Sequence, residues 1–414
     1  MSGARPWLVW AAGALFFCYA FFLRTSPAVM ADELMRDFSV GAALLGNLAA
    51  FYFYAYAAEQ IGVGVLVDNF GPRRILTLAA LLAVLGCLLF GTAQTLHQAY
   101  AGRLLIGFGA GFGWVASLAL VARWFPQHRF ALLSGLTALG GMVGAASGGA
   151  PLAALVDWTG WRVPMIGAAV GGAGLAMACW ILVRDHPAPQ TVARAARPSL
   201  LHSLRLASAN RQTWIIAFYT GTVVSPFLGI SSLWGVPYLI HVHGHERASA
   251  ALIASLLIAG MALGSPLLGW ASDKIGRRRP AMWFAIGIQA VGYGVAFYVS
   301  DVSPLLFGAM LFLAGIGGAG IIVGFATGRE ANDPQALGAA MGIVNTGVIG
   351  GGALIQPAIG MILDQHWEGV MIAGARIYSE GAYQFAFATL FASLALAFVA
   401  TLFVRETWCG QQKL

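Results

Sequence analysis

Charged residues are scarce in this chain. Of its 414 residues, 59% are hydrophobic and only 9% are charged, whereas a soluble domain carries about 25% charged residues. So little charge cannot cover a surface that faces water, which excludes a soluble globular protein. Apolar runs of about 20 residues recur along the chain instead, and each is long enough to cross a bilayer core of ~30 Å. The sequence therefore predicts an all-α polytopic membrane protein.

Cysteine is scarce as well, since the chain has only four. Cys18, Cys87 and Cys179 lie inside apolar runs and Cys409 lies near the C-terminus, with neither a disulfide framework nor metal-ligand spacing. No nucleophile, base and metal constellation is visible either, so we expect no enzyme activity and no cofactor. Glycine, in contrast, is abundant with 54 residues, and inside apolar runs small residues let helices pack closely.

The apolar runs predict 12 membrane-spanning helices in two sets of six. The first set is expected near residues 7–30, 41–67, 74–95, 98–123, 130–156 and 161–184. The second set is expected near residues 213–240, 247–271, 280–299, 303–328, 336–363 and 380–405. These sets predict an N-terminal six-helix bundle over 1–184, a cytoplasmic linker over 185–212 and a C-terminal six-helix bundle over 213–414. We interpret the first apolar run as a retained helix, because removing it would leave an odd number of spans.

The positions of the basic residues predict the orientation of the chain. Of the 23 Lys and Arg residues, 17 fall on the side of the termini and the linker, while Arg36, Arg162, Arg247 and Arg376 fall on the opposite side. Cytoplasmic loops carry the excess of positive charge in membrane proteins. We therefore expect both termini and the linker in the cytoplasm and the protein in the cell inner membrane. The net charge of +7 then reports topology and not nucleic-acid binding.

One loop pattern occurs twice, after the second and after the eighth predicted helix. Its first copy is Gly64-Val-Leu-Val-Asp68-Asn-Phe-Gly71-Pro-Arg73-Arg74, and its second is Gly269-Trp-Ala-Ser-Asp273-Lys-Ile-Gly276-Arg-Arg278-Arg279. The second glycine of each copy permits a tight turn. The aspartate is expected to meet a basic residue or a helix N-terminus across the interface between the halves, as part of a gate. The alternative is a membrane-edge loop with anchoring arginines. The predicted gate residues are Gly64, Asp68, Gly71, Arg73, Gly269, Asp273, Gly276 and Arg278.

These paired loops resemble the signature of the major facilitator superfamily. The segment 103–111, Arg-Leu-Leu-Ile-Gly-Phe-Gly-Ala-Gly, resembles the fourth-helix motif of that family, and 157–162, Asp-Trp-Thr-Gly-Trp-Arg, resembles the segment that follows its fifth helix. The resemblance covers essentially the whole chain. It implies two six-helix bundles, a central cavity lined chiefly by helices 1, 4, 7 and 10, and transport by alternating access.

A narrower resemblance rests on shorter segments. Arg24-Thr-Ser-Pro27, Trp234-Gly-Val-Pro237 and 264–269 look like a bacterial permease group that includes phagosomal amino-acid and nucleoside transporters. The chain departs from that pattern at Glu59-Gln60-Ile61-Gly62, where an uncharged residue before Gln60 and a proline after it would be expected. The fifth helix also lacks the Gly-Pro pair of drug-proton antiporters, which favours import over drug export.

Three charged residues lie inside predicted spans, where charge is costly and marks function. Arg24 lies roughly 25 Å from the linker-side edge of its helix, and Arg103 roughly 8 Å below the opposite face, at a rise of ~1.5 Å per residue. At similar depth, two guanidiniums could converge on a carboxylate or phosphate. The alternatives are that Arg24 extends to the outer interface and that Arg103 only bonds helix backbone.

Glu59 is the third such charge, and it shares a helix face with Tyr52 and Tyr56 at spacings i, i+4 and i+7. A low-dielectric environment favours the neutral carboxyl group, which suits a group that loads and releases a proton. The alternative is a structural ion pair. Besides Arg24 and Arg103, the predicted substrate-binding residues are Tyr19, Tyr52, Tyr56, Tyr219, Trp234, Tyr238 and Asn345.

Together these features predict a secondary active transporter that imports a small anionic or zwitterionic solute, such as an organic acid or amino acid, with a proton. Its partners are expected to be the substrate, protons and the lipid bilayer, and the carrier is expected to act as a monomer. The alternatives are an uncoupled facilitator, an efflux carrier or a transporter-like ligand sensor. Metal or siderophore transport stays open through His241, His243 and His245 near the outer mouth, although no metal site is predicted.

Overall fold

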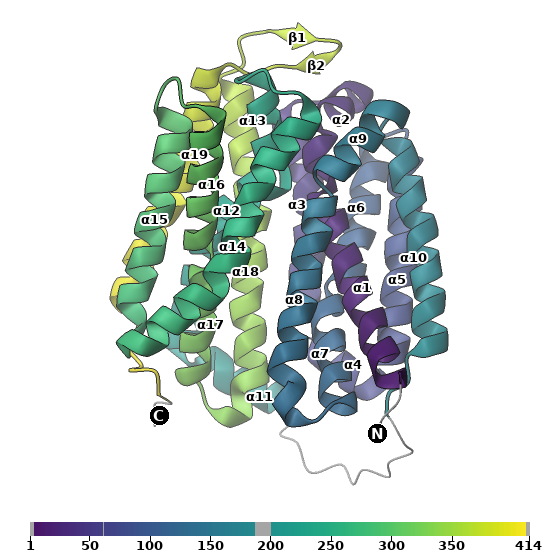
Figure 1. Ribbon diagram of the computed structural model, residues 1–414, viewed down its shortest axis with the longest axis vertical. Coiled ribbons are helices and arrows are strands. Elements are labelled where there is room, and N and C mark those ends of the chain that lie inside the picture. Colours follow the sequence, from purple (N-terminus) through teal and green to yellow (C-terminus); the bar gives the residue numbers. More distant parts are fainter. Residues whose placement is uncertain (1–3, 61, 187–199, 411–414) are drawn as a thin grey trace.

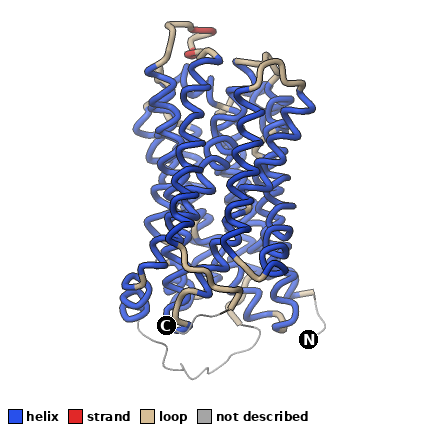
Figure 2. The backbone as a smooth tube through the Cα atoms, turned by 90° about the vertical axis from the view of Figure 1, so that its left-hand side faces the viewer, coloured by secondary structure: helices blue, strands red, loops and turns tan. Residues whose placement is uncertain are grey.

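The computed structural model describes residues 4–60, 62–186 and 200–410. Within these residues, 11 helices are long and apolar enough to cross a membrane, or up to 12 if the bent pair Ala31–Phe38 and Ala42–Glu59 counts as one span. They stand side by side as one elongated bundle of helices (Figures 1 and 2). The chain is thus an all-helical, multi-pass membrane protein, as the apolar runs predict.

The helices that precede the linker form one half of the bundle (Figure 1). They are α1 (Arg5–Thr25), η1 (Ser26–Val29), α2 (Ala31–Phe38), α3 (Ala42–Glu59), α4 (Val63–Phe70), α5 (Pro72–Gly91), α6 (Leu96–Ala110), α7 (Phe112–Trp124), η2 (Gln127–Arg129), α8 (Phe130–Ser147), α9 (Ala150–Thr159) and α10 (Arg162–Leu182). Below, these elements are called the first half.

The remaining elements form the second half. They are α11 (Leu200–Ala209), α12 (Arg211–Gly229), the π-helical turn η3 (Ile230–Trp234), α13 (Gly235–His241), α14 (Arg247–Ile275), α15 (Arg278–Tyr298), α16 (Pro304–Gly318), α17 (Gly320–Glu330), η4 (Pro334–Ala336), α18 (Leu337–Gln365), β1 (Met371–Ile372), β2 (Ala375–Arg376) and α19 (Glu380–Phe403). The two strands pair as an antiparallel hairpin.

Local sequence signals explain where several helices begin. Thr95 forms a capping box with Gln98 at the start of α6, and the Ser303 side chain caps α16. Pro72 and Pro304 stand in the first turns of α5 and α16, where the missing amide N–H costs nothing. These three helices therefore start at a residue that satisfies their free amides or lacks one.

The structure differs from the predicted spans in several places. The helix predicted over 41–67 is broken, because α3 ends at Glu59 and α4 begins at Val63. Helix α2 lies in a segment for which no separate helix is predicted, and α11 lies inside the predicted linker. Part of that linker, residues 187–199, lies outside the described residues. The short helices were missed because they have too few apolar residues to form a membrane-length run.

The start of α1, the last described residues of the chain and α11 lie at one end of the bundle, which we call the linker side. The hairpin β1–β2 lies at the other end, the hairpin side (Figure 1). The halves meet through α3 and α18, which pack along much of their length. A Cβ atom at Gly46 of α3 or at Gly360 of α18 would overlap the backbone of the other helix, at Gln356 and Ala42 respectively. Glycine therefore permits backbone-to-backbone packing between the halves.

Polar contacts also join the halves on the hairpin side. The Asp364 carboxylate accepts hydrogen bonds from the Ala42 and Ala43 amides at 3.0 and 2.9 Å, so α18 caps the N-terminus of α3. Arg247 of α14 pairs with Glu33 of α2 and, at 3.1 Å, with Asp157 of α9. The largest buried hydrophobic cluster spans both halves, whereas two smaller clusters near the linker side each lie within one half. The structure is therefore closed on the hairpin side.

Candidate substrate site

Arg103 is buried between α6 and α1. Its side chain is 0% exposed, its Nη1 donates to the carbonyl oxygen of Leu23 at 2.8 Å, and its guanidinium lies 5.1 Å from the ring centre of Tyr52 in α3. The Nε and Nη2 atoms have no hydrogen-bond partner among the described residues. Arg103 thus joins α6 to α1 through helix backbone, as the structural interpretation of this residue predicts. Its remaining N–H groups are available to donate hydrogen bonds.

Arg24 follows Leu23, so the backbone contact of Arg103 brings both arginines to the same part of the first half. Arg24 lies in the last turn of α1, just before η1, where Pro27 interrupts the regular helix. It is half-buried, with its guanidinium 3.8 Å from the ring centre of Phe21, and its buried Nε has no hydrogen-bond partner in the described part of the chain. No carboxylate among residues 4–60, 62–186 and 200–410 forms an ion pair with it.

The tyrosines predicted to share a face with Glu59 lie beside these arginines. Tyr52 and Tyr56 are buried with ring centres 5.9 Å apart, and both phenols interact electrostatically with Arg24. The Tyr52 hydroxyl donates to the carbonyl oxygen of Ala20 in α1 at 3.4 Å. Arg24, Arg103, Tyr52 and Tyr56 thus form one cluster from α1, α3 and α6, which we call the arginine cluster.

Glu59 is the last residue of α3 and is 7% exposed. Neither carboxylate oxygen has a hydrogen-bond partner among the described residues. The side chain packs where α6 and α7 are separated at Gly111, because a Cβ there would overlap a Glu59 oxygen. Next to it, Gln60 donates to the Gly111 carbonyl oxygen at 3.4 Å and accepts from Asn345 of α18 at 2.5 Å. The unpaired carboxyl group therefore lies beside a helix break and a contact between the halves.

The other predicted binding residues do not join the arginine cluster. The Tyr19 hydroxyl donates to Ala168 in α10 at 2.9 Å, and that of Tyr219 donates to Gly320 in α17 at 3.3 Å. The Trp234 indole donates to the Gln356 carbonyl oxygen at 3.1 Å. Tyr238 lies in an aromatic group with Phe297, Phe307, Tyr383 and Phe387. These side chains fill the protein interior in this conformation.

The repeated loops form tight turns, with Gly71 and Gly276 at φ of +83° and +71°. Asp68 pairs with Arg123 at 3.3 Å, within the first half. Asp273 pairs at 2.7 Å with Arg278, which also pairs with Glu330 at 2.5 Å, within the second half. In this conformation these ion pairs thus each lie within one half, and a contact of either aspartate across the interface stays a prediction. The Arg73 amide donates to Asp185 at 2.9 Å, and its guanidinium lies over Trp180.

His241, which is expected near the outer mouth, is the last residue of α13, and its side chain is only 2% exposed. Its Nε2 lies 3.1 Å from Asp32 in α2, and its Nδ1 lies 3.2 Å from the Tyr383 hydroxyl in α19. The ring therefore bridges the two halves on the hairpin side. No group of three or more His, Cys, Asp or Glu residues in the described part of the chain is arranged to hold a metal ion.

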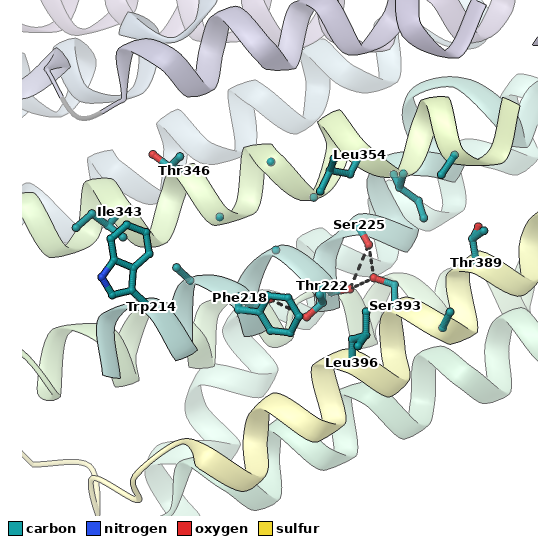
Figure 3. Close-up of a pocket in the computed structure, with 18 residues that line it drawn as sticks. Trp214, Phe218, Thr222, Ser225, Ile343, Thr346, Leu354, Thr389, Ser393 and Leu396 are labelled. Carbon is teal, nitrogen blue, oxygen red and sulfur yellow. Dashed lines mark hydrogen bonds between the residues drawn. The ribbon is translucent and has the colours of Figure 1, made fainter. Parts of the chain in front are cut away.

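The largest cavity that we describe lies away from both arginines. It is a groove of about 610 Å³ in the second half, with α12 as its floor and α18 and α19 as its walls (Figure 3). Trp214, Phe218 and Leu354 line it and are 54%, 51% and 74% exposed. Such exposed apolar side chains face lipid in a membrane protein. The groove is therefore distinct from the arginine cluster.

Two helical halves, of which the first holds buried, unpaired charge, form the architecture of a membrane carrier. The chain belongs to the Major Facilitator Superfamily, whose family model matches residues 11–246 and 222–408. It is thus a secondary transporter by family and not an enzyme.

Relatives support this family over nearly the whole chain. The chain is 25% identical over 388 residues to the membrane sensor protein UhpC of Salmonella typhimurium, covering 87% of this chain and 85% of that protein. It is 22% identical to a probable hexose phosphate transport protein of Chlamydia trachomatis, covering 86% and 85%. The narrower resemblance to phagosomal amino-acid and nucleoside transporters receives no support from these relatives.

A solved structure has the same fold. It is a bacterial homologue of the human lysosomal transporter Spinster, in an inward-facing and unoccupied conformation. The two structures superpose with a TM-score of 0.77 at 19% identity, covering 97% of this chain and 98% of the other. At this identity the likeness shows the fold alone.

Proposed function

We propose that this transporter imports a small organic anion that carries a carboxylate or phosphate group, with a proton as the coupling ion. The observation that carries the proposal is the half-buried guanidinium of Arg24, which has no carboxylate partner among the described residues. A charge held inside a membrane protein without a partner is costly unless a ligand meets it. The similarity to a hexose phosphate transport protein agrees with an anionic ligand.

The two arginines have different roles in this proposal. Arg103 is fully buried and uses Nη1 to hold Leu23, so it positions the end of α1 and adds positive potential. Arg24 retains more of its N–H groups, and a guanidinium can donate two parallel hydrogen bonds to a carboxylate or phosphate. Arg24 is therefore the residue that binds the anion directly.

Glu59 is the proposed proton carrier. Its carboxyl group is buried and has no partner in the described structure, and burial without a counter-charge favours the protonated form. It lies beside Gln60, whose hydrogen bond to Asn345 joins the halves. A change in how the halves meet would therefore change the surroundings of the proton site.

We further propose that the linker side is cytoplasmic, from the 17 basic residues that the sequence places on that side against four on the other. Closure on the hairpin side then makes this conformation inward-facing. Cys409 near the C-terminus provides the test, in a variant whose other three cysteines are serine. A membrane-impermeant thiol reagent should label it in inside-out vesicles and not in intact cells. Labelling in intact cells would reverse the orientation.

Binding of candidate anions tests the role of Arg24. Purified protein is screened by thermal shift with hexose phosphates and organic acids, because a ligand of the native state raises its melting temperature. A charge-assisted hydrogen bond contributes about 1.5–3 kcal/mol. Arg24→Ala should therefore weaken binding of the best anion about 10- to 100-fold or more, and Arg24→Lys should lie between Arg24→Ala and the parent protein, because it keeps the charge and loses the planar fork.

The matched control is Arg74→Ala, which removes an exposed arginine on the linker side. It should bind the anion as the parent protein does. Unchanged affinity in Arg24→Ala, with the protein folded, would remove Arg24 from the substrate site and leave the substrate class open.

The similarity to UhpC favours one alternative, a transporter-like sensor that binds the anion without moving it rapidly. Proteoliposomes separate the two functions. A transporter accumulates the labelled anion under an imposed pH gradient, whereas a sensor binds it with the same dependence on Arg24 and shows no accumulation.

A further inference from the structure

The groove between α12, α18 and α19 has the dimensions of one half of a bilayer. Along its floor, Trp214 and Ser225 are 11 residues apart, which corresponds to ~16 Å of helix. The hydrocarbon core of a membrane is ~30 Å thick, so one leaflet accounts for ~15 Å. The groove therefore runs along the depth that the acyl chain of one lipid occupies.

The polar atoms in the groove are already bonded to one another (Figure 3). The hydroxyl groups of Ser225 and Ser393 lie 2.6 Å apart, and Ser393 also donates to the Thr222 carbonyl oxygen at 2.9 Å. The Thr222 hydroxyl donates to Phe218 at 2.7 Å. What remains for an occupant is an apolar surface, because the exposed lining residues include Phe218, Leu354 and Leu396. Such a lining suits a hydrocarbon chain.

Positive charge stands at the linker-side end of this groove. A second cavity shares Trp214 and Phe218 with the groove and extends it to Arg211 and Phe403. Arg405 is held close by, because its amide donates to the Gln212 side chain at 2.8 Å. Both arginines are exposed, and neither has an ion-pair partner among the described residues. The Trp214 indole donates to Ser208 at 2.9 Å, so its polar edge points to the same end.

We infer that this groove binds an anionic phospholipid of the linker-side leaflet. One acyl chain lies along α12 between α18 and α19, and the phosphate lies at Arg211 and Arg405. Basic residues at the membrane edge between helices attract anionic headgroups, and the interfacial tryptophan fixes the depth.

This inference does not depend on the proposed substrate or on proton coupling. The arginine cluster lies in the first half, whereas every residue of the groove lies in the second. Lipid binding is also measured without any substrate. Failure of the lipid experiment therefore leaves the proposed transport function untouched, and the reverse also holds.

Native mass spectrometry of the full chain in detergent tests the site. The protein is titrated with phosphatidylglycerol and with phosphatidylcholine of the same acyl chains. We expect one phosphatidylglycerol to bind at least tenfold more tightly than phosphatidylcholine. The double variant Arg211→Gln with Arg405→Gln should weaken the binding of phosphatidylglycerol about 10- to 30-fold. It should thereby abolish the preference for phosphatidylglycerol over phosphatidylcholine. Glycerol phosphate, which has the headgroup chemistry without acyl chains, should not compete.

A second variant fills the groove without touching charge. Gly350 lines the groove, and a Cβ added there meets no atom within 4 Å, so Gly350→Phe places a ring in the space of the acyl chain. This variant should weaken the binding of both phosphatidylglycerol and phosphatidylcholine. Gly287→Phe in α15, where a Cβ also meets no atom within 4 Å, and Arg74→Gln at the linker-side surface are the matched controls and should bind lipid as the parent does.

Three results would overturn the inference. One is equal affinity for both lipids in the parent protein. Another is unchanged phosphatidylglycerol binding in the double arginine variant and in Gly350→Phe, with both folded by melting temperature. The third is a stable two-chain species that Gly350→Phe abolishes, since that species would make the groove an interface between copies.

Discussion

The two halves of the molecule share one architecture but differ in the charge that they hold inside the membrane. In the first half, Arg103 and Glu59 are buried and Arg24 is half-buried. None of these three residues has an ion-pair partner among the described residues. In the second half, Arg278 is buried but is the first residue of α15 and pairs with Asp273 and Glu330. Unpaired charge inside the membrane is thus concentrated in the first half, where it can act on a ligand or a proton.

The interior of the second half relies on uncharged polar side chains. The amide of Gln289 in α15 donates to the Val223 carbonyl oxygen at 3.1 Å, and that of Gln356 in α18 donates to Leu228 at 3.4 Å. Both acceptors lie in the part of α12 that precedes the π-helical turn η3. These contacts hold α12 in place without introducing charge. The two halves thus differ in how their interiors are built, with unpaired charge in the first and uncharged hydrogen bonds in the second.

The largest expected effect comes from removing the buried carboxyl group of Glu59, which has no partner among the described residues. Glu59→Gln resembles a permanently protonated Glu59, so the loaded carrier should still exchange substrate, but it cannot release the proton that drives accumulation. We expect counterflow in proteoliposomes close to the parent rate and a loss of at least tenfold in uptake driven by an imposed pH gradient.

Two outcomes would reject the role of Glu59 as the proton carrier of the first half. Unchanged accumulation in Glu59→Gln would mean that the proton is carried elsewhere. Loss of counterflow together with accumulation would make Glu59 a structural residue of the break between α3 and α4.

The smallest effect is expected in the second half, at Gln356→Leu. Gln356 is 0% exposed, and its Oε1 has no partner among the described residues. Leucine removes one long hydrogen bond together with an unsatisfied acceptor, so the free energy of unfolding should change by about 1 kcal/mol or less. Anion affinity should change less than about threefold. A loss comparable to that of Arg24→Ala would show that the second half contacts the anion directly.

The architecture was accessible from the sequence because each long helix has a membrane-length apolar run. The helix predicted over 303–328 is found as α16 and α17, and the one predicted over 336–363 as α18. The break between α3 and α4 was not predicted, because residues 41–67 are apolar on both sides of Glu59. Hydropathy reports the medium around a segment and not the continuity of its backbone hydrogen bonds.

The candidate site was predictable only in part. Charge inside a span pointed to Arg24, Arg103 and Glu59, and helix rise placed the two arginines at similar depth. The contacts of Asp32, Glu33 and His241 were not predictable, because they join α2 to helices more than 200 residues away in the chain. Spacing along one helix says nothing about partners that meet only when the halves pack. Tyr19 was predicted to bind substrate because it lies on the first helix, but its hydroxyl faces α10 and donates to Ala168 there. The sequence of one helix does not show which way such a side chain faces.

The glycine contacts between α3 and α18 bear on how fast the two halves can move apart. Gly46 and Gly360 each rest directly on the backbone of the opposite helix, so no side chain interlocks with the other half at these points. Separating two such surfaces requires no rotamer change and leaves no side chain to repack, so these points add little to the kinetic barrier between conformations. The ion pairs of Asp32, Glu33 and Arg247 on the same side can then determine the relative populations of the two conformations, while the glycines keep the exchange between them fast.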